Sequence, residues 1–128
     1  MKTTGFVFAA TVLAGCIFAS SVHAACTGSN GRGWGRGNGA GSFQMTAADK
    51  SCRIGFTNVI NDRTKTSVPA NKVSVTRAPK NGKVQVTGKG LVYTPAKGFK
   101  GSDSFCTKNT TPKAPGVVLS GCITVAVR

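Results

Sequence analysis

The chain has 128 residues and a formal net charge of +14, because 17 lysines and arginines are balanced by only three acidic residues. This length allows one domain of ordinary size and not two. The sequence contains no glutamate and a single histidine, so it lacks the groups that general acid–base catalysis needs, and three scattered aspartates offer little to a metal ion. We therefore expect a non-catalytic protein without a metal or cofactor.

The first 24 residues predict a secretory signal peptide, which is removed in the mature protein. Lys2 precedes an apolar run, and the segment ends in Val22-His23-Ala24, the small-x-small pattern of a cleavage site. Cleavage after Ala24 leaves residues 25–128 and lowers the net charge by one, to +13, because Lys2 is the only charged residue lost. We expect a secreted or periplasmic protein.

Two other interpretations of this segment remain open. One is a membrane anchor, although Gly and Thr interrupt the apolar run and no basic stop-transfer flank follows it. The other is an outer-membrane lipoprotein, since Leu13-Ala14-Gly15-Cys16 resembles a lipobox, in which cleavage before Cys16 leaves a lipidated cysteine. Against it, the apolar run continues beyond Cys16, whereas a lipoprotein tether is normally polar at once.

Residues 25–42 are rich in glycine and arginine and predict a flexible arm. Glycine recurs through the stretch at nearly every second position, and nothing in it can bury a core. Arg32 and Arg36 flank Trp34, an arrangement typical of segments that bind polyanions by charge and stacking. The alternative interpretation is a solvated loop whose single tryptophan docks on the domain.

The remaining residues, 43–128, predict an all-β domain. Short segments of alternating polar and apolar residues are separated by turn signals, and helix signals are absent. We expect about seven short strands packed as an antiparallel sandwich. Their centres are residues 43–46, 52–56, 73–76, 83–87, 91–93, the segment around residue 105, and 123–127.

A corner motif joins the later strands and reads Tyr93-x-Pro95-x-x-x-Phe99-x-Gly101-x-Asp103-x-Phe105. Pro95 ends a strand, glycine lets the chain turn, and Asp103 is expected to accept hydrogen bonds from nearby backbone N–H groups before Phe105 enters the core. The motif resembles the bacterial Ig-like or cadherin-like β-sandwich repeat of surface and secreted proteins. The resemblance covers roughly residues 73–127 and implies an Ig-like fold. Members of this family usually occur in tandem as spacers or as modules that bind sugars and partners, whereas one copy is present here.

Four cysteines lie outside the predicted signal peptide, and an even number in a small exported domain predicts two disulfides. Strand parity predicts that Cys106 and Cys122 both point outward, because their neighbours point inward, so the two face each other across the last hairpin. Cys52 is then left for Cys26. The alternative is a bridge between Cys52 and Cys106, as in antibody domains.

Two classes of function remain. The first is attachment to an anionic polymer or surface, such as acidic polysaccharide, lipopolysaccharide or lipid headgroups, because so few acids are present to pair with the positive charge. Nucleic acid is an unexpected partner for an exported protein. The second is a structural domain that contacts another envelope protein, with a charge that serves only solubility. For the first class, we expect contacts from one aromatic and six basic side chains: Arg32, Trp34, Arg36, Lys80, Lys89, Lys97 and Lys100.

Overall fold

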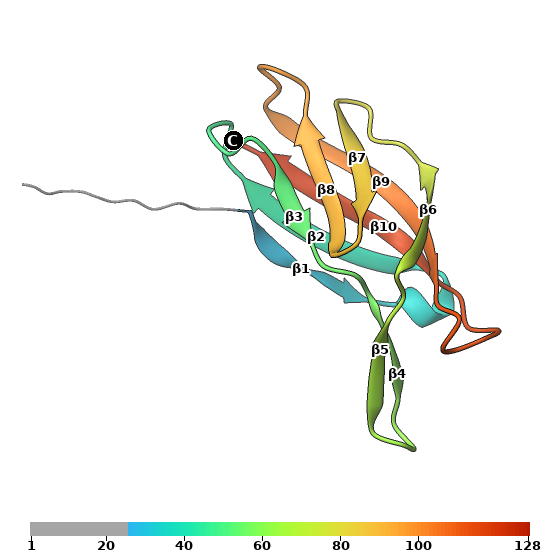
Figure 1. Cartoon of the computed structure of the whole chain (residues 1–128). Helices are drawn as coiled ribbons and strands as arrows, with labels where there is room; N and C mark the ends of the chain where they lie inside the picture. Colours follow the sequence, from blue (N-terminus) through green and yellow to red (C-terminus); the bar gives the residue numbers. More distant parts are fainter. Residues whose placement is uncertain (1–25) are drawn as a thin grey trace, which may run out of the picture.

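The computed structural model describes residues 26–128 and consists almost entirely of β-structure (Figure 1). The predicted signal peptide and the Cys16 alternative lie outside the described residues. Within residues 26–128 there is no α-helix, and one short 3-10 helix, η2, follows the first strand. The elements are β1 (Thr27–Arg32), η2 (Trp34–Arg36), β2 (Gly39–Met45), β3 (Cys52–Ile54), β4 (Asn58–Asn61), β5 (Thr66–Pro69), β6 (Lys72–Arg77), β7 (Gly82–Thr87), β8 (Gly90–Pro95), β9 (Gly101–Thr110) and β10 (Leu119–Val127). The expected all-β class is confirmed.

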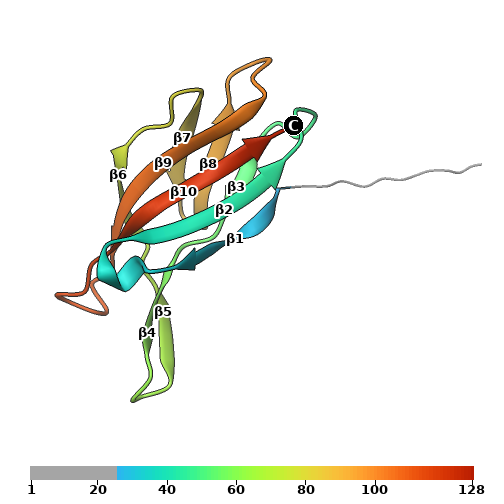
Figure 2. The same cartoon turned by 180° about the vertical axis from the view of Figure 1, so that it is seen from behind.

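Eight of these strands form two sheets that lie face to face. The larger sheet has the order β1-β2-β10-β9-β6, and the smaller has the order β3-β8-β7. Figures 1 and 2 view the domain from opposite sides, and the smaller sheet lies in front of the larger one in the first and behind it in the second. The two remaining strands, β4 and β5, form a separate hairpin that projects from one end of these layers.

Inward side chains of both sheets form one core. Tyr93 of β8 and Phe105 of β9 are fully buried and stack with ring centroids 6.2 Å apart. Alternate residues of β2, β9 and β10 are buried, because successive side chains of a strand point to opposite faces. Each large apolar side chain buried in this way contributes about 1.5–3 kcal/mol to stability. The core residues are Trp34, Phe43, Met45, Cys52, Ile54, Ala70, Leu91, Tyr93, Phe105, Leu119, Ile123, Val125 and Val127.

The prediction of a flexible arm over residues 25–42 is wrong for the part that the structure describes. This stretch forms β1, η2 and the start of β2, and β2 lies between β1 and β10 in the larger sheet. Glycine permits close contacts here. A Cβ atom on Gly39 of β2 would lie 2.3 Å from the Trp34 ring, and a Cβ atom on Gly121 of the neighbouring strand β10 would lie 2.3 Å from the Gly39 Cα atom. Glycine here lets two backbones and a ring approach one another, as it often does inside strands.

The expected antiparallel sandwich of seven strands also needs correction. The pair β2–β10 is parallel, in a register that runs from Gly39 opposite Gly121 to Met45 opposite Val127, so the larger sheet is mixed. The structure has ten strands within residues 26–128, and the sequence analysis missed β1, β4 and β5. The seven predicted strands correspond to β2, β3 and β6 to β10.

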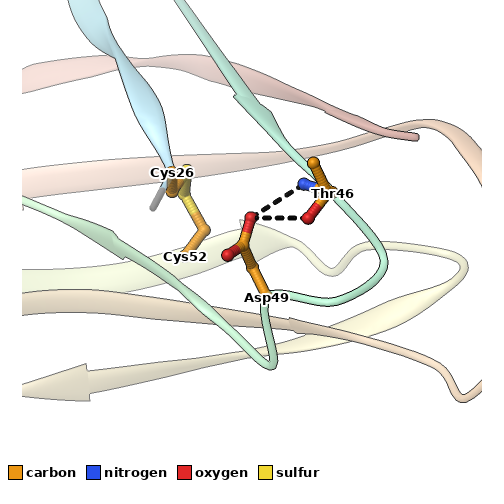
Figure 3. Close-up of a disulfide and its surroundings, with 4 residues drawn as sticks. All are labelled: Cys26, Thr46, Asp49 and Cys52. Carbon is orange, nitrogen blue, oxygen red and sulfur yellow. Dashed lines mark hydrogen bonds between the residues drawn. A yellow bond between two sulfur atoms is a disulfide. The ribbon is translucent and has the colours of Figure 1, made fainter. Parts of the chain in front are cut away.

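Both predicted disulfides are present, Cys26–Cys52 and Cys106–Cys122. Cys106 lies directly opposite Cys122 in the register of β9 and β10, so the parity argument is confirmed and the alternative Cys52–Cys106 bridge is wrong. The first bridge joins the start of β1 to β3 and therefore links the two sheets (Figure 3). Each contributes about 3 kcal/mol by constraining the unfolded chain.

The two disulfides are consistent with an oxidising extracellular or periplasmic location. Among residues 26–128, none of the helices has the length and apolar character that crossing a membrane requires.

Candidate polyanion-binding surface

Asp103 fixes the corner at the start of β9, as the sequence analysis predicted. Its Oδ1 atom accepts hydrogen bonds from the backbone N–H groups of Lys80 at 3.0 Å and Ser104 at 2.9 Å. Its Oδ2 atom accepts from the Asn81 N–H group at 2.9 Å and from the Tyr93 hydroxyl at 2.8 Å. The carboxylate therefore joins β8, β9 and the β6–β7 loop.

These contacts shift the pKa values of both side chains. Burial of Asp103, which is 5% exposed, by itself raises the pKa of the carboxyl group, but the hydrogen bonds from Tyr93 and from three backbone N–H groups outweigh burial and lower that pKa overall. Burial and the hydrogen bond to Asp103 both raise the pKa of Tyr93. Asp103 is thus ionised at neutral pH, and its four hydrogen bonds serve the fold.

The three predicted contacts from the glycine-rich stretch do not form one exposed cluster. Trp34 is only 6% exposed, packs on Gly39, and donates its Nε1–H to the Asn30 carbonyl oxygen at 2.6 Å. The prediction that Trp34 stacks on a ligand is therefore wrong, and the alternative of a docked tryptophan is confirmed. Arg32 at the end of β1 and Arg36 in η2 are exposed.

The four predicted lysines are all exposed, but they lie in two separate regions. Lys80 is in the β6–β7 loop, and Lys97 and Lys100 are in the β8–β9 loop. A hydrogen bond of 2.7 Å from the Ala96 N–H group to the Asn81 carbonyl oxygen holds these two loops together. Lys89 lies in the β7–β8 turn, at the other end of β8. Helix η2 is also at the end of the domain away from the β8–β9 loop (Figures 1 and 2).

The structure instead reveals an outer face, formed by the side of the larger sheet that points away from the smaller one. No other described element covers this face, as Figure 2 shows. Four hydroxyl-bearing residues lie side by side on it, in register across four adjacent strands, and we call them the hydroxyl row: Ser29 of β1, Ser42 of β2, Thr124 of β10 and Ser104 of β9. Asp103, the only acidic residue in the five strands, points into the core. The outer face thus presents no carboxylate from its strands.

A recess lies where the outer face meets the β6–β7 loop, and we call it the Arg77 recess. It has a volume of about 340 Å³, and its lining includes Arg77, Lys80, Asn81, Ser102, Ser104 and Thr124. The Arg77 Nη2 atom donates a hydrogen bond of 2.8 Å to the Ser104 hydroxyl, which aligns the guanidinium group with the end of the hydroxyl row. The recess is lined by two cations, Arg77 and Lys80, and by one acidic residue, Asp103, whose carboxylate lies beneath them.

Arg77 is not among the contacts predicted from the sequence. A register shift between Val75 and Arg77 pairs Arg77 with Cys106 and brings it onto the outer face. Simple alternation along β6 would place Arg77 on the same side as Val73, which packs against the core. Only the pairing of β6 with β9 reveals its position.

Comparison of the chain with protein-family models, with curated proteins and with solved structures finds no match. Within residues 26–128, no group of three or more His, Cys, Asp or Glu side chains is placed to hold a metal ion. A second recess of about 410 Å³ lies beside β3 and β8 and includes Arg53 and Lys89. The Arg77 recess is continuous with the outer face, because it shares Ser104 and Thr124 with the hydroxyl row.

Proposed function

We propose that this chain is an exported, non-catalytic binding module with an Ig-like β-sandwich fold, and that it attaches to anionic polymers of the cell envelope or extracellular space. The binding surface is the outer face of the larger sheet together with the Arg77 recess. One observation carries this proposal: the outer face presents hydroxyls and cations, while the single acidic residue of its strands points into the core.

The chain's charge supports this assignment. Asp49 and Asp103 accept hydrogen bonds from backbone N–H and hydroxyl groups, in a protein with 17 basic residues and three acidic ones. Most lysines and arginines therefore lack an acidic neighbour to neutralise them. Such a charge distribution creates a positive potential that concentrates anions at the surface.

The Ig-like assignment rests on the two facing sheets and on the corner in which Tyr93 stacks on Phe105 and donates to Asp103. The assignment to an exported protein rests on the signal-peptide pattern of the first 24 residues, with cleavage after Ala24, and on the two disulfides.

Retention on an immobilised acidic polysaccharide over a salt series tests the proposal. We expect the wild type to be retained at low salt and released as salt rises, because screening shortens the range of charge interactions to about 8–10 Å at 0.10–0.15 M. The variant Arg32→Ala/Arg77→Ala, changed on the outer face, should elute at clearly lower salt. Lys97→Ala/Lys100→Ala is the matched control, since it removes the same charge from the β8–β9 loop.

Equal loss of retention in the two double variants would contradict the outer face as the contact surface. No retention of the wild type on acidic polysaccharide or on anionic lipid vesicles, even at low salt, would reject polyanion binding. The charge would then serve solubility, and the domain would act as a structural or protein-interaction module.

A further inference from the structure

The hydroxyl row has the dimensions of an extended binding track. Neighbouring strands of a sheet lie about 4.7–4.9 Å apart, so the row from Ser29 to Ser104 spans roughly 14 Å across three strand intervals. Its side chains are short, so no residue of the row rises above the others. A linear ligand can therefore lie flat across the strands and meet one hydroxyl on each.

By the register of the strands, four cations lie on the outer face: Arg32 on the edge strand β1, Lys72 and Arg77 on the edge strand β6, and Lys108 on β9 next to β6. The row of residues next to the hydroxyl row begins with Arg32 on β1 and ends with Arg77 on β6, and Ala40 and the Cys106–Cys122 disulfide lie between them. Four strand intervals separate the two arginines, which is roughly 19 Å between their backbones. The hydroxyl row itself thus offers hydrogen-bonding groups and no charge, and most of the positive charge lies on the β9 and β6 side of the outer face.

The arrangement of hydroxyls and cations on the outer face favours one class of polyanion over another. Each nucleotide carries a charged phosphate, so every link of a nucleic-acid chain would bring a negative charge onto a hydroxyl row that holds no cation. Proteins that bind single strands also stack bases on exposed aromatic rings, whereas Trp34 and Tyr93 are both buried. A polymer with many hydroxyls and few charges fits the outer face better.

The Arg77 recess can hold one anionic group of such a polymer. A guanidinium group presents paired N–H donors that match the two oxygens of a carboxylate or sulfate. Arg77 uses its Nη2 atom on Ser104, and Lys80, Ser102 and Thr124 line the same recess. Asp103 also lines the recess, but it is only 5% exposed and both of its oxygens already accept two hydrogen bonds each. The other groups can surround one anionic substituent of a polymer chain that continues along the hydroxyl row.

We infer that the ligand is a linear acidic polysaccharide that lies across the strands along the hydroxyl row, with one carboxylate or sulfate group in the Arg77 recess. This inference rests on the proposed function and narrows it. Sugar hydroxyls exchange hydrogen bonds with the row, and the length of one sugar unit is comparable to the spacing of the strands.

Direct mapping of the wild type by NMR tests the position of the ligand. Titration with hyaluronan oligosaccharide, which carries one carboxylate on every second sugar, and with κ-carrageenan oligosaccharide, which carries one sulfate on every second sugar, should shift amide signals of β1, β2, β10 and β9 at the row and of the β6–β7 loop at the recess. The oligosaccharide that binds more tightly identifies the anionic group. Inorganic polyphosphate and single-stranded DNA of equal total charge should bind at least tenfold more weakly.

A matched pair of threonine variants tests the place where the hydroxyl row meets the Arg77 recess. Thr124→Val removes a hydroxyl from the row and keeps the β-branched shape that strands favour, and we expect it to weaken binding about threefold to tenfold, the effect of one net hydrogen bond. Thr94→Val makes the same change at an exposed position of β8 and should leave binding unchanged.

Equal effects of Thr124→Val and Thr94→Val would overturn the inference, as would amide shifts confined to the β8–β9 loop. Equal or tighter binding of polyphosphate or DNA would overturn it too, although polyanion binding itself would stand. If none of the four polymers binds, the proposed function fails together with the inference.

Discussion

Replacing Asp103 with asparagine measures how much of the fold depends on the corner at the start of β9. The carboxylate accepts two hydrogen bonds at each oxygen, from Lys80 and Ser104 at Oδ1 and from Asn81 and Tyr93 at Oδ2. An amide keeps one acceptor oxygen and places an NH2 group at the other position. The Tyr93 hydroxyl can turn to accept from this group, but a backbone N–H group cannot.

The variant therefore leaves at least one backbone N–H group of the corner without an acceptor and replaces charged hydrogen bonds with neutral ones. A hydrogen bond to a charged group contributes about 1.5–3 kcal/mol, and an unsatisfied buried donor costs about 1–3 kcal/mol. We expect Asp103→Asn to lower the free energy of unfolding by about 2–4 kcal/mol. This loss is a large fraction of the 5–15 kcal/mol that is typical of a domain.

Asp49→Asn is the control, because it removes the same negative charge by the same chemical change. The Asp49 Oδ2 atom accepts hydrogen bonds from the Thr46 N–H group at 2.9 Å and the Thr46 hydroxyl at 3.0 Å, in the exposed β2–β3 loop (Figure 3). An amide oxygen can accept both, so we expect a change within about 0.5 kcal/mol. The measurement is urea unfolding of the oxidised proteins at pH 7.

The pH dependence gives a second criterion. The folded-state pKa of Asp103 is lowered, so its contribution to stability is complete above the unfolded-state value of about 3.9 and is lost as the pH falls through the folded-state pKa. The stabilities of the wild type and Asp103→Asn should therefore converge below about pH 4. Equal destabilisation by Asp103→Asn and Asp49→Asn at pH 7, or a difference that persists unchanged into strong acid, would refute this account of the corner.

Three further predictions follow from buried contacts. Gly121→Ala should cost about 3 kcal/mol in urea unfolding, because its Cβ atom would meet the backbone of β2 at 2.3 Å, whereas Gly35→Ala, which has nothing within 4 Å, should be neutral. Asn109→Ala should cost about 1–3 kcal/mol and speed hydrogen exchange in the β4–β5 hairpin, because it removes a buried 2.8 Å bond from Asn109 Nδ2 to the Thr57 hydroxyl at the base of the hairpin. Tyr93 is the only tyrosine, and its raised pKa stabilises the folded state below the unfolded-state value of about 10, so tyrosinate absorbance should appear at higher pH in the native protein than in urea. Tyrosinate appearing at the same pH in both states would contradict burial of this hydroxyl.

The features that were predictable from the sequence depend on local spacing. Alternation along β9 and β10 places Phe105 and Ile123 inward, and this fixes Cys106 and Cys122 on the outer face opposite each other. The acceptor role of Asp103 follows from its place in the corner motif, between Gly101 and Phe105. Such patterns involve only a few neighbouring residues, so they can be recognised without knowing which distant segments of the chain pair.

The features that were not predictable depend on contacts between distant segments. Gly39 and Gly41 look like linker residues until Trp34 and Ile123 are seen packed against them. The parallel pairing of β2 with β10 joins segments about 80 residues apart and leaves no local signal. The β4–β5 hairpin had a signal that was missed, since Asn61 begins a polar turn between two short runs that contain Val59 and Val68.

The missed start of β2, residues 39–42, and the proposed binding surface have the same physical cause. Small residues on the inward side of β2 and β10, such as Gly39 and Gly121, allow the two strands to approach closely, and small residues on the outward side, such as Ser42 and Thr124, keep the opposite face level. Larger side chains would have made the start of β2 recognisable in the sequence, but they would also have made the face uneven. The composition that resembles a flexible arm in the sequence therefore also keeps the hydroxyl row of the proposed binding surface level.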